Sequence, residues 1–582
     1  MANSMGSLFI GESGLKTSQN AMNMTANNFA NVDTKGYVRQ RILQEDKNYD
    51  TYKRTAAIAP SQSGLGVSIG DVIHARDIFL DKTFRTQTGR SGFYSATFEA
   101  ISEAETLFQE LEGTSFQEIL LAEEGSLWAA FQEFAKNPSD KANQNLVVQK
   151  ASLFESRSKA VYNGLKKYQS NLNQQISDAV DRINEIGNRI RELNIEIMKV
   201  ESAGVETAMN LRDERDLLLD ELAEYGDISY KEVANGIVKV NFENVAFVDE
   251  IHVFEMGKKT DKVTGFVTPY WPQLTNEERG ECYTVYNTSA EISPSKKNDI
   301  GSLKALLLAR GDKAANYRDL EGVSMKEYDA TLGNSVMMNI EAELDMLIHK
   351  LVTGINDLYA KNTASKTAIT GKDENGNDVS FAAGTLILDE ENCYLPADGS
   401  LPPQELFVRT GCSRYTKVEG DDGKTYYVYN EEDPNDTAKQ YTVGSIHVNP
   451  KLLESEALMP AYRQNGRDEE LPVAHDLGEA LAALWDEEGM FLSPHDTTPC
   501  TFGEFYAKMT GELTALGDVF GSTAAGLEGT ARETDNSRQQ VIGVSSDEEL
   551  TNMIKFQNAY NASSRFINVI SEMIETIIYR MG

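Results

Sequence analysis

The sequence predicts an elongated, multidomain α+β protein that consists of a terminal α-helical coiled coil, a helical-bundle domain and β-rich insertions. Three observations support this fold class. Apolar residues repeat every seven positions at both chain ends, and a helical pattern continues without a break over residues 161–200. Two internal segments instead alternate apolar and polar residues, as strands do. The chain of 582 residues is also too long for a single hydrophobic core and should divide into several domains.

The N-terminal segment is poor in charge. Its first 32 residues contain only Glu12 and Lys16 as charged side chains, although charged residues make up 25% of the whole chain. Four apolar residues follow one another at intervals of seven, namely Leu8, Leu15, Met22 and Phe29. On a helix they form a narrow stripe, which needs a packing partner.

The C-terminus supplies a matching pattern. Two heptad rows, interrupted only by Ser563, contain Met553, Phe556, Tyr560, Ile567, Ile570, Ile574 and Ile577. We expect the two chain ends to pair into one coiled unit, with the rest of the chain inserted between them, and their eleven apolar residues to form an assembly interface. The alternative is that the two patterns belong to unrelated core helices.

The strongest helical signal lies between Val161 and Val200, where apolar residues alternate strictly at spacings of four and three. A helix of this length spans about 60 Å, which predicts a rod-like bundle. Further helical patterns at 325–359 and 502–516 supply neighbours for it.

The strand-like segments are Tyr230 to Tyr286 and Thr363 to Asn449. In the second, residues 415–418 and 425–429 flank an acidic turn and predict a hairpin, and Asn375 to Asn377 mark another turn. The predicted division is a terminal coiled-coil domain (1–45 plus 545–582), a helical rod domain (46–229 plus 300–360 plus 450–544), a β-rich insertion (230–299) and an outer β-rich insertion (361–449).

Composition excludes several classes of function. The formal charge of −35 repels nucleic acid and anionic lipid, and no run of 18 apolar residues predicts membrane insertion. The N-terminus lacks the basic and apolar regions of a cleaved secretory signal. The four cysteines are scattered and predict neither disulfides nor a zinc site.

Two short patterns resemble catalytic or metal-binding motifs. Gly66 to Gly70 matches G-x-S-x-G around Ser68, with His74 nearby, but no apolar strand precedes the serine and no helix follows it. Asp373, Asn375 and Asn377 begin like a calcium loop that lacks the required glycine and glutamate. We therefore expect no enzyme activity, no cofactor and no metal, and we keep a secreted hydrolase using Ser68 as a remote alternative.

The segment that follows the N-terminal stripe resembles the ANNxANxxTxGYxRQ signature of the flagellar rod, hook and hook-associated proteins. The matching residues are Ala26, Asn27, Asn28, Asn31, Thr34, Gly36 and Tyr37, followed by Arg39 and Gln40. The run 543–550 and the helix after it are similar to the matching C-terminal end. On the residues alone, a helix ends near Asn31, a turn leads into an extended segment, and Ser545 or Ser546 caps the last helix.

Internal stretches are similar to the hook-associated members that join hook to filament, among them the G-x-GV segment at 64–85, the helical segment at 127–140 and the L-x-D-x-RD helix at 211–217. This resemblance implies a homo-oligomeric ring between hook and filament, located outside the cell. It also implies three partners, which are hook protein, a filament-side hook-associated protein and an export chaperone. The alternatives are a hook or rod subunit of the same group and an acidic adhesin acting through the β insertions.

Overall fold

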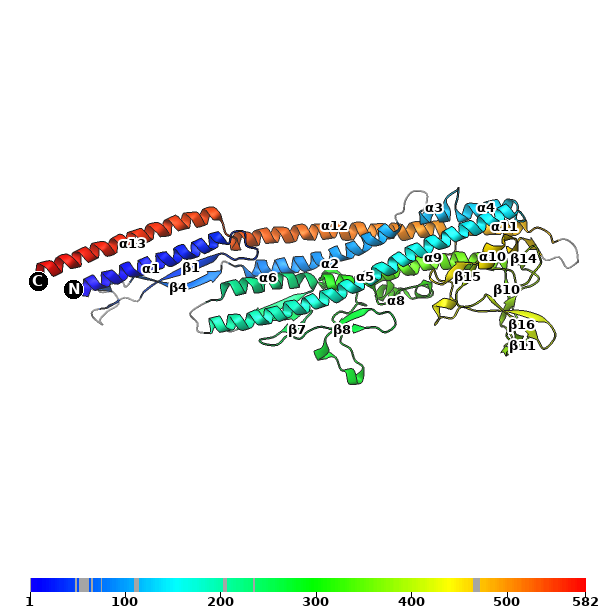
Figure 1. Ribbon diagram of the computed structural model, residues 1–582, viewed down its shortest axis with the longest axis horizontal. Coiled ribbons are helices and arrows are strands. Elements are labelled where there is room, and N and C mark those ends of the chain that lie inside the picture. Colours follow the sequence, from blue (N-terminus) through cyan, green and yellow to red (C-terminus); the bar gives the residue numbers. More distant parts are fainter. Residues whose placement is uncertain are drawn as a thin grey trace.

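The computed structural model is a long rod with both chain termini at one end (Figure 1). It describes residues 2–47, 50–51, 62–63, 66–74, 76–108, 115–202, 207–233, 236–463 and 471–581. Long helices run along the rod and small sheets project from its side and from its far end. The predicted elongated α+β class is confirmed.

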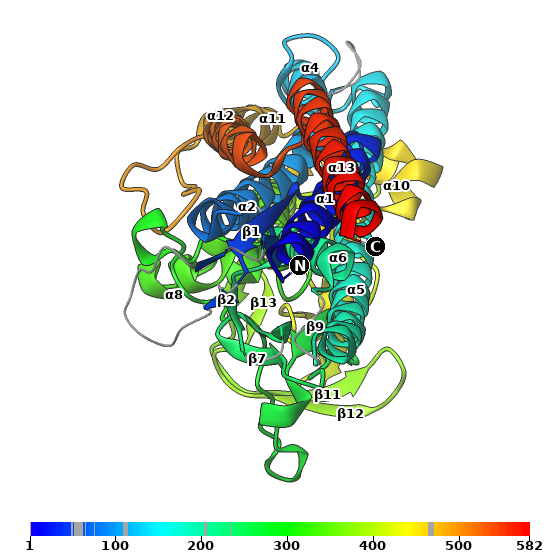
Figure 2. The ribbon, with the colours of Figure 1, turned by 90° about the vertical axis from the view of Figure 1, so that its left-hand side faces the viewer.

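The two terminal helices, α1 (Ala2–Ala30) and α13 (Ser546–Met581), lie side by side (Figures 1 and 2). The extended segment predicted after the N-terminal turn is β1 (Gln40–Asp46), which pairs antiparallel with β4 (Val67–His74). Both strands pack against α1. The terminal end of the rod is therefore two helices backed by a two-stranded ribbon.

The middle of the rod is a helical bundle. Its long members are α2 (Ile78–Phe108), α5 (Lys141–Glu201), α6 (Met209–Tyr225) and α12 (Phe502–Ile542). The predicted long helix is confirmed and begins twenty residues earlier than its apolar pattern, because Asp140 caps α5 by accepting a hydrogen bond from the Ala142 amide. α12 packs along α2 and also continues well beyond the predicted 502–516.

The other described α-helices are α3 (Phe116–Leu121), α4 (Leu127–Lys136), α7 (Ser302–Arg310), α8 (Met325–Ala330), α9 (Val336–Tyr359), α10 (Pro450–Glu454) and α11 (His475–Ala483). α7 packs against α2, α5 and α6 in the middle of the rod, whereas α3, α4, α10 and α11 lie at its far end (Figure 1). The prediction of one continuous helix over 325–359 is wrong. A 3₁₀ turn, Leu332–Asn334, separates α8 from α9, and Ser335 starts the new helix by accepting a hydrogen bond from the Met338 amide.

Both predicted β insertions are present. The first contains β5 (Ile228–Glu232), β6 (Val238–Phe242), β7 (Val245–Val248), β8 (Gly257–Thr260) and β9 (Val267–Tyr270). The second contains β10 (Asn362–Ala364), β11 (Ile369–Asp373), β12 (Asp378–Phe381), β13 (Leu386–Leu388), β14 (Tyr394–Leu395), β15 (Phe407–Arg409), β16 (Tyr415–Gly420), β17 (Thr425–Tyr429) and β18 (Ile446–Val448). The predicted hairpin is β16–β17, in a sheet of order β10-β13-β17-β16-β11-β12. Two short pairs complete the described strands, β2 (Asp50–Thr51) with β3 (Gln62–Ser63), and β14 with β19 (Tyr462–Arg463).

Candidate assembly site at the terminal helix pair

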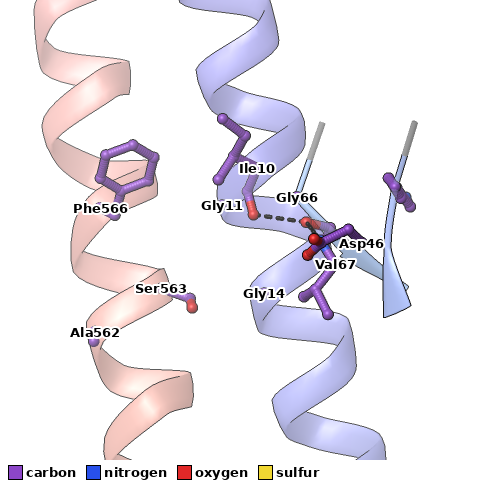
Figure 3. A pocket seen from close by; sticks show the side chains of 11 residues that line it. Ile10, Gly11, Gly14, Asp46, Gly66, Val67, Ala562, Ser563 and Phe566 are labelled. Carbon is purple, nitrogen blue, oxygen red and sulfur yellow. Dashed lines mark hydrogen bonds between the residues drawn. The ribbon is translucent and has the colours of Figure 1, made fainter. Parts of the chain in front are cut away.

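The contact between α1 and α13 is made through small residues on α1. A Cβ atom placed on Gly11 would lie 2.6 Å from Cγ1 of Ile567, and one placed on Gly14 would lie 2.8 Å from Oγ of Ser563 (Figure 3). Any side chain at Gly11 would therefore push the helices apart. The buried residues of α1 are Gly11, Ser13, Thr17, Ser18, Ala21, Thr25 and Asn28.

The predicted apolar residues lie around this contact. On α13, Met553, Phe556, Tyr560, Ile567, Ile570 and Ile574 are half-buried, whereas Ile577 is 41% exposed. On α1, Leu8, Leu15 and Met22 are half-buried and Phe29 is exposed. The most buried row of α1 therefore consists of small residues beside the predicted apolar stripe. Glycine in this row lets the α1 and α13 backbones approach each other closely. As an assembly interface, the eleven residues stay a prediction.

The N-terminal motif forms a hydrogen-bonded turn at the base of α1. Asn31 donates to the Asn27 carbonyl oxygen at 2.9 Å, and Thr34 donates its hydroxyl to Oδ1 of Asn31 at 3.1 Å. Gly36 has φ +82°, a backbone conformation that favours glycine. Ala26 is exposed on the helix before this turn. The turn redirects the chain from α1 into β1.

Asn28 is the buried centre of this turn. Its Oδ1 accepts hydrogen bonds from the Tyr37 hydroxyl (2.8 Å) and the Gln40 amide (3.2 Å), and its Nδ2 donates to the Gln40 carbonyl oxygen (3.0 Å) and to Oε2 of Glu549 (3.3 Å). Burial, followed by the charges of Asp213 and Glu549, raises the pKa of Tyr37 to about 12. The hydroxyl therefore keeps its proton at neutral pH and can donate it to Asn28.

Arg39 joins the two ends of the chain. Its Nε donates to Oε1 of Glu549 at 2.7 Å and its NH1 donates to Oε2 of Glu548 at 2.6 Å. Burial opposes the charge, but the two glutamates outweigh it and raise the pKa of Arg39. The Arg39 amide also donates to the Ile542 carbonyl oxygen, the last residue of α12. The cation thus holds the start of α13 against β1.

The terminal pair is attached to the rod through α6. The Val38 amide donates to Oδ2 of Asp213 at 3.1 Å. Burial raises the pKa of the Asp213 carboxyl to about 7, against the opposing effects of the Val38 amide and of Arg76. Close by, Arg76 is paired with Asp216 and Asp81. These contacts bring the L-x-D-x-RD segment of α6 to the base of the helix pair.

A second set of ion pairs lies along the bundle just beyond this joint. Asp220 of α6 accepts from Arg85 of α2 at 2.7 Å and from Arg538 of α12 at 2.6 Å. The Arg538 guanidinium also lies 4.0 Å from the ring centre of Phe84. One carboxylate therefore connects three helices of the rod at the end that carries the terminal pair.

Sequence reasoning missed Arg39, Glu548 and Glu549 as functional residues. All three stand inside the two flagellar motif runs, but their pairing joins positions 510 residues apart in the chain. The sequence did contain a signal for this ion pair, namely a basic residue in the N-terminal motif and two acidic residues in the C-terminal one.

The remaining motifs are integrated into local structure. Ser68 lies within β4, as expected, and its hydroxyl donates to the Glu45 carbonyl oxygen at 3.4 Å; the side chain of His74 lies outside the described residues. Asp373 accepts from the amides of Asn375 (2.9 Å) and Asn377 (2.7 Å), which closes the β11–β12 turn. The described ranges contain no group of three or more His, Cys, Asp or Glu placed to hold a metal. None of their helices combines the length and apolar character that crossing a membrane requires.

Gly66 is the sensitive position of the G-x-S-x-G segment. Its φ is +92°, and a Cβ there would lie 2.0 Å from Oγ of Ser13 and 3.2 Å from the α1 backbone at Ile10. We expect Gly66→Val to cost about 2 kcal/mol or more, whereas Ser68→Ala should stay within about 1 kcal/mol. Hydrogen exchange of α1 in the two variants measures this difference. Ester hydrolysis by the purified protein that disappears in Ser68→Ala would contradict a structural role for this segment.

Comparison with known proteins places these observations in a family. Residues 101–373 match the model for the flagellar hook-associated protein FlgK helical domain, residues 8–37 that for flagella basal body rod protein, and residues 540–579 that for the flagellar basal body rod FlgEFG protein C-terminal. The two rod-protein matches cover the two segments that pair in the structure. The middle match covers α5, α6 and the first β insertion.

Similar proteins span almost the whole chain. Flagellar hook-associated protein 1 of Bacillus subtilis (strain 168) is 26% identical over 98% of this chain and 96% of its own length. Flagellar hook-associated protein 1 of Escherichia coli (strain K12) is 20% identical, over 97% of this chain and 98% of its own length. The solved flagellar hook junction protein FlgK from Burkholderia pseudomallei is 11% identical with a TM-score of 0.46, covering 79% of this chain and 99% of that chain.

A bundle whose two chain ends form one helix pair, each end matching a rod-protein family, defines a structural protein of the bacterial flagellum. Within that class, the chain is similar along almost its whole length to flagellar hook-associated protein 1, and residues 101–373 match the FlgK helical domain.

Proposed function

We propose that this protein joins hook to filament as a ring of identical subunits that assemble through their paired terminal helices. The observation that carries the proposal is apolar surface on the terminal pair. Phe9 on α1 is 58% exposed, and Met573 on α13 is 56% exposed. Other exposed apolar side chains on α13 are Ile554, Phe566, Val569, Ile577, Ile578 and Tyr579. Surface of this kind in a soluble chain marks an interaction site.

The proposal includes the setting and the partners. The subunit acts outside the cell after export without a cleaved signal, and its partners are hook protein, a filament-side hook-associated protein and an export chaperone. The names of the relatives support this setting. Its contribution is packing and not catalysis. The division into a terminal unit of 1–45 plus 545–582, a helical rod and two β insertions is part of the same proposal.

Electron microscopy of cells that lack this gene tests the junction role. We expect flagella that end at the hook, with filament protein released into the medium, and recovery when the full chain is supplied. A normal filament would refute the junction role. Loss of the hook itself would favour the alternative, a hook or rod subunit. The matches to rod-protein families at both chain ends are the reason for testing this alternative against the junction role.

A further inference from the structure

Three polar side chains form a buried row along one face of α9. Glu341, Asp345 and His349 follow one another at intervals of four, so they lie on the same side of the helix. Glu341 and Asp345 are each only 1% exposed, and their neighbours on α9 belong to the hydrophobic core of the rod. Burying carboxyl groups in such a place costs free energy unless other groups bind them.

The two carboxyls hold the 312–320 segment, which lies between α7 and α8. The Ala315 amide donates to Oε2 of Glu341 at 2.9 Å, and the Tyr317 amide donates to Oδ2 of Asp345 at 3.0 Å. The other oxygen of Glu341, Oε1, is buried and has no hydrogen-bond partner among the described residues. A buried carboxylate oxygen without a donor favours the protonated form of the carboxyl.

The row also holds the outer β insertion. The 432–445 segment of this insertion leads from β17 to β18, and its Val443 amide donates to Oδ1 of Asp345 at 2.7 Å. Glu432 of the same segment accepts a hydrogen bond from the Tyr317 hydroxyl at 2.8 Å, so the two segments also contact each other. Asp345 therefore ties both segments to one turn of α9.

His349 completes the row, and a cavity opens beside it. The His349 ring stacks on Tyr317 with 3.6 Å between the ring centres, and its Nδ1 lies 3.3 Å from the Tyr441 carbonyl oxygen. The cavity has a volume of 310 Å³ and is bordered by Asp345 and Lys166. It is large enough for water, so Asp345 can exchange protons with the solvent.

Burial and like charge both favour a proton on the carboxyl pair. Burial raises the pKa of Glu341 to about 7, although the Ala315 amide and Lys166 oppose it. Burial likewise raises the pKa of Asp345 to about 7, against the two amides that donate to it. Like charges one helical turn apart also repel each other. The charged and titratable groups that surround the row are Tyr162 and Lys166 of α5, Lys350 of α9, Tyr317, Arg318, Asp319 and Glu321 before α8, and Glu432 and Tyr441 of the outer insertion.

We propose that Glu341 and Asp345 form a proton-sensitive clamp on the outer β insertion. A proton on this pair holds the 312–320 and 432–445 segments on α9, and ionisation of both carboxyls loosens the two segments together. Both pKa values are raised from unfolded values of about 4, so the stabilisation is complete below about pH 4 and is lost as the pH rises through about 7. The clamp does not depend on the proposed junction role.

Hydrogen exchange of the purified full-length protein tests the clamp. The protection of amides in the 312–320 and 432–445 segments is measured at about pH 6 and about pH 8, relative to amides in the middle of α5. In this range His349 is largely neutral, because burial lowers its pKa below the usual value. We expect the relative protection to fall about hundredfold between the two pH values, about tenfold for each carboxyl of the pair.

Glu341→Gln separates the pair. Glutamine keeps an oxygen for the Ala315 amide but has no charge, so of the pair only Asp345 still titrates, and the loss of relative protection should shrink to about tenfold. Glu327→Gln is the matched control, because it makes the same exchange at an exposed glutamate of α8 and should keep the hundredfold loss of the parent.

Three results would overturn the clamp. The first is constant relative protection of the parent between the two pH values, a result that needs no variant. The second is an equal loss in Glu341→Gln and the parent. The third is a Glu341→Gln protein that is already less protected than the parent at about pH 6, since glutamine imitates the protonated carboxyl.

Discussion

Replacing Ile567 by aspartate should detach the two terminal helices from each other and abolish filament attachment. A Cβ atom placed on Gly11 would lie only 2.6 Å from Cγ1 of Ile567. The Ile567 side chain therefore packs directly on the α1 backbone. An aspartate carboxylate at position 567 would face the buried side of α1 without a cation to pair with. The cost is about 2 kcal/mol or more in each copy, and it recurs around the assembled ring.

Two measurements follow this variant. Hydrogen exchange of α1 and α13 reports the opening of the helix pair in the free protein, and the swimming radius with filament protein in the medium reports assembly. Asn561→Asp is the matched control, since it places the same carboxylate on an exposed face of the same helix. Normal exchange and normal filaments in Ile567→Asp would show that the seam contributes to neither the helix pair nor the assembly.

The elements that could be predicted from sequence are those with a strong local period. The pattern from Val161 to Val200 predicted α5 because every third or fourth residue faces the core, and Ile176, Ile183 and Ile190 are indeed buried. The acidic β16–β17 hairpin was equally visible, since two alternating runs flank a glycine-containing turn. Periodicity also gave the face of α13 that packs toward α1.

The missed features depend on single residues or on distant contacts. Apolar periodicity continues from 325 to 359, but Ser335 competes for a backbone amide and starts a new helix there. On α1 the period identified Leu8 and Leu15, yet the deeper row begins at Gly11, because packing distance and not hydrophobicity selects it. The Arg39–Glu549 pair joins opposite ends of the chain, and no local pattern encodes which charges meet.

Removing the cation at the base of the helix pair should be the most disruptive change of a single charge there. Glu549 is only 2% exposed, and Arg39 contacts it through both Nε and NH2. In Arg39→Met, Glu549 keeps the Asn28 amide as a donor but loses its counter-ion. Leaving a buried charge without its partner typically costs about 3–5 kcal/mol. We expect α13 to open from β1 at its first turn, with faster exchange of its amides and loss of motility.

A double-mutant cycle separates this penalty from lost packing. Arg39→Met/Glu549→Met removes both charges, so it should be less damaging than Arg39→Met alone, because no buried carboxylate is left unpaired. Lys16→Met is the control: it breaks the Lys16–Glu12 pair on α1, in which both side chains are more than half exposed, and should leave exchange and motility almost unchanged. If the effects of the Arg39 and Glu549 substitutions simply add, the ion pair does not couple the two chain ends, and the close packing of Gly11 and Gly14 against α13 is what holds the terminal unit together.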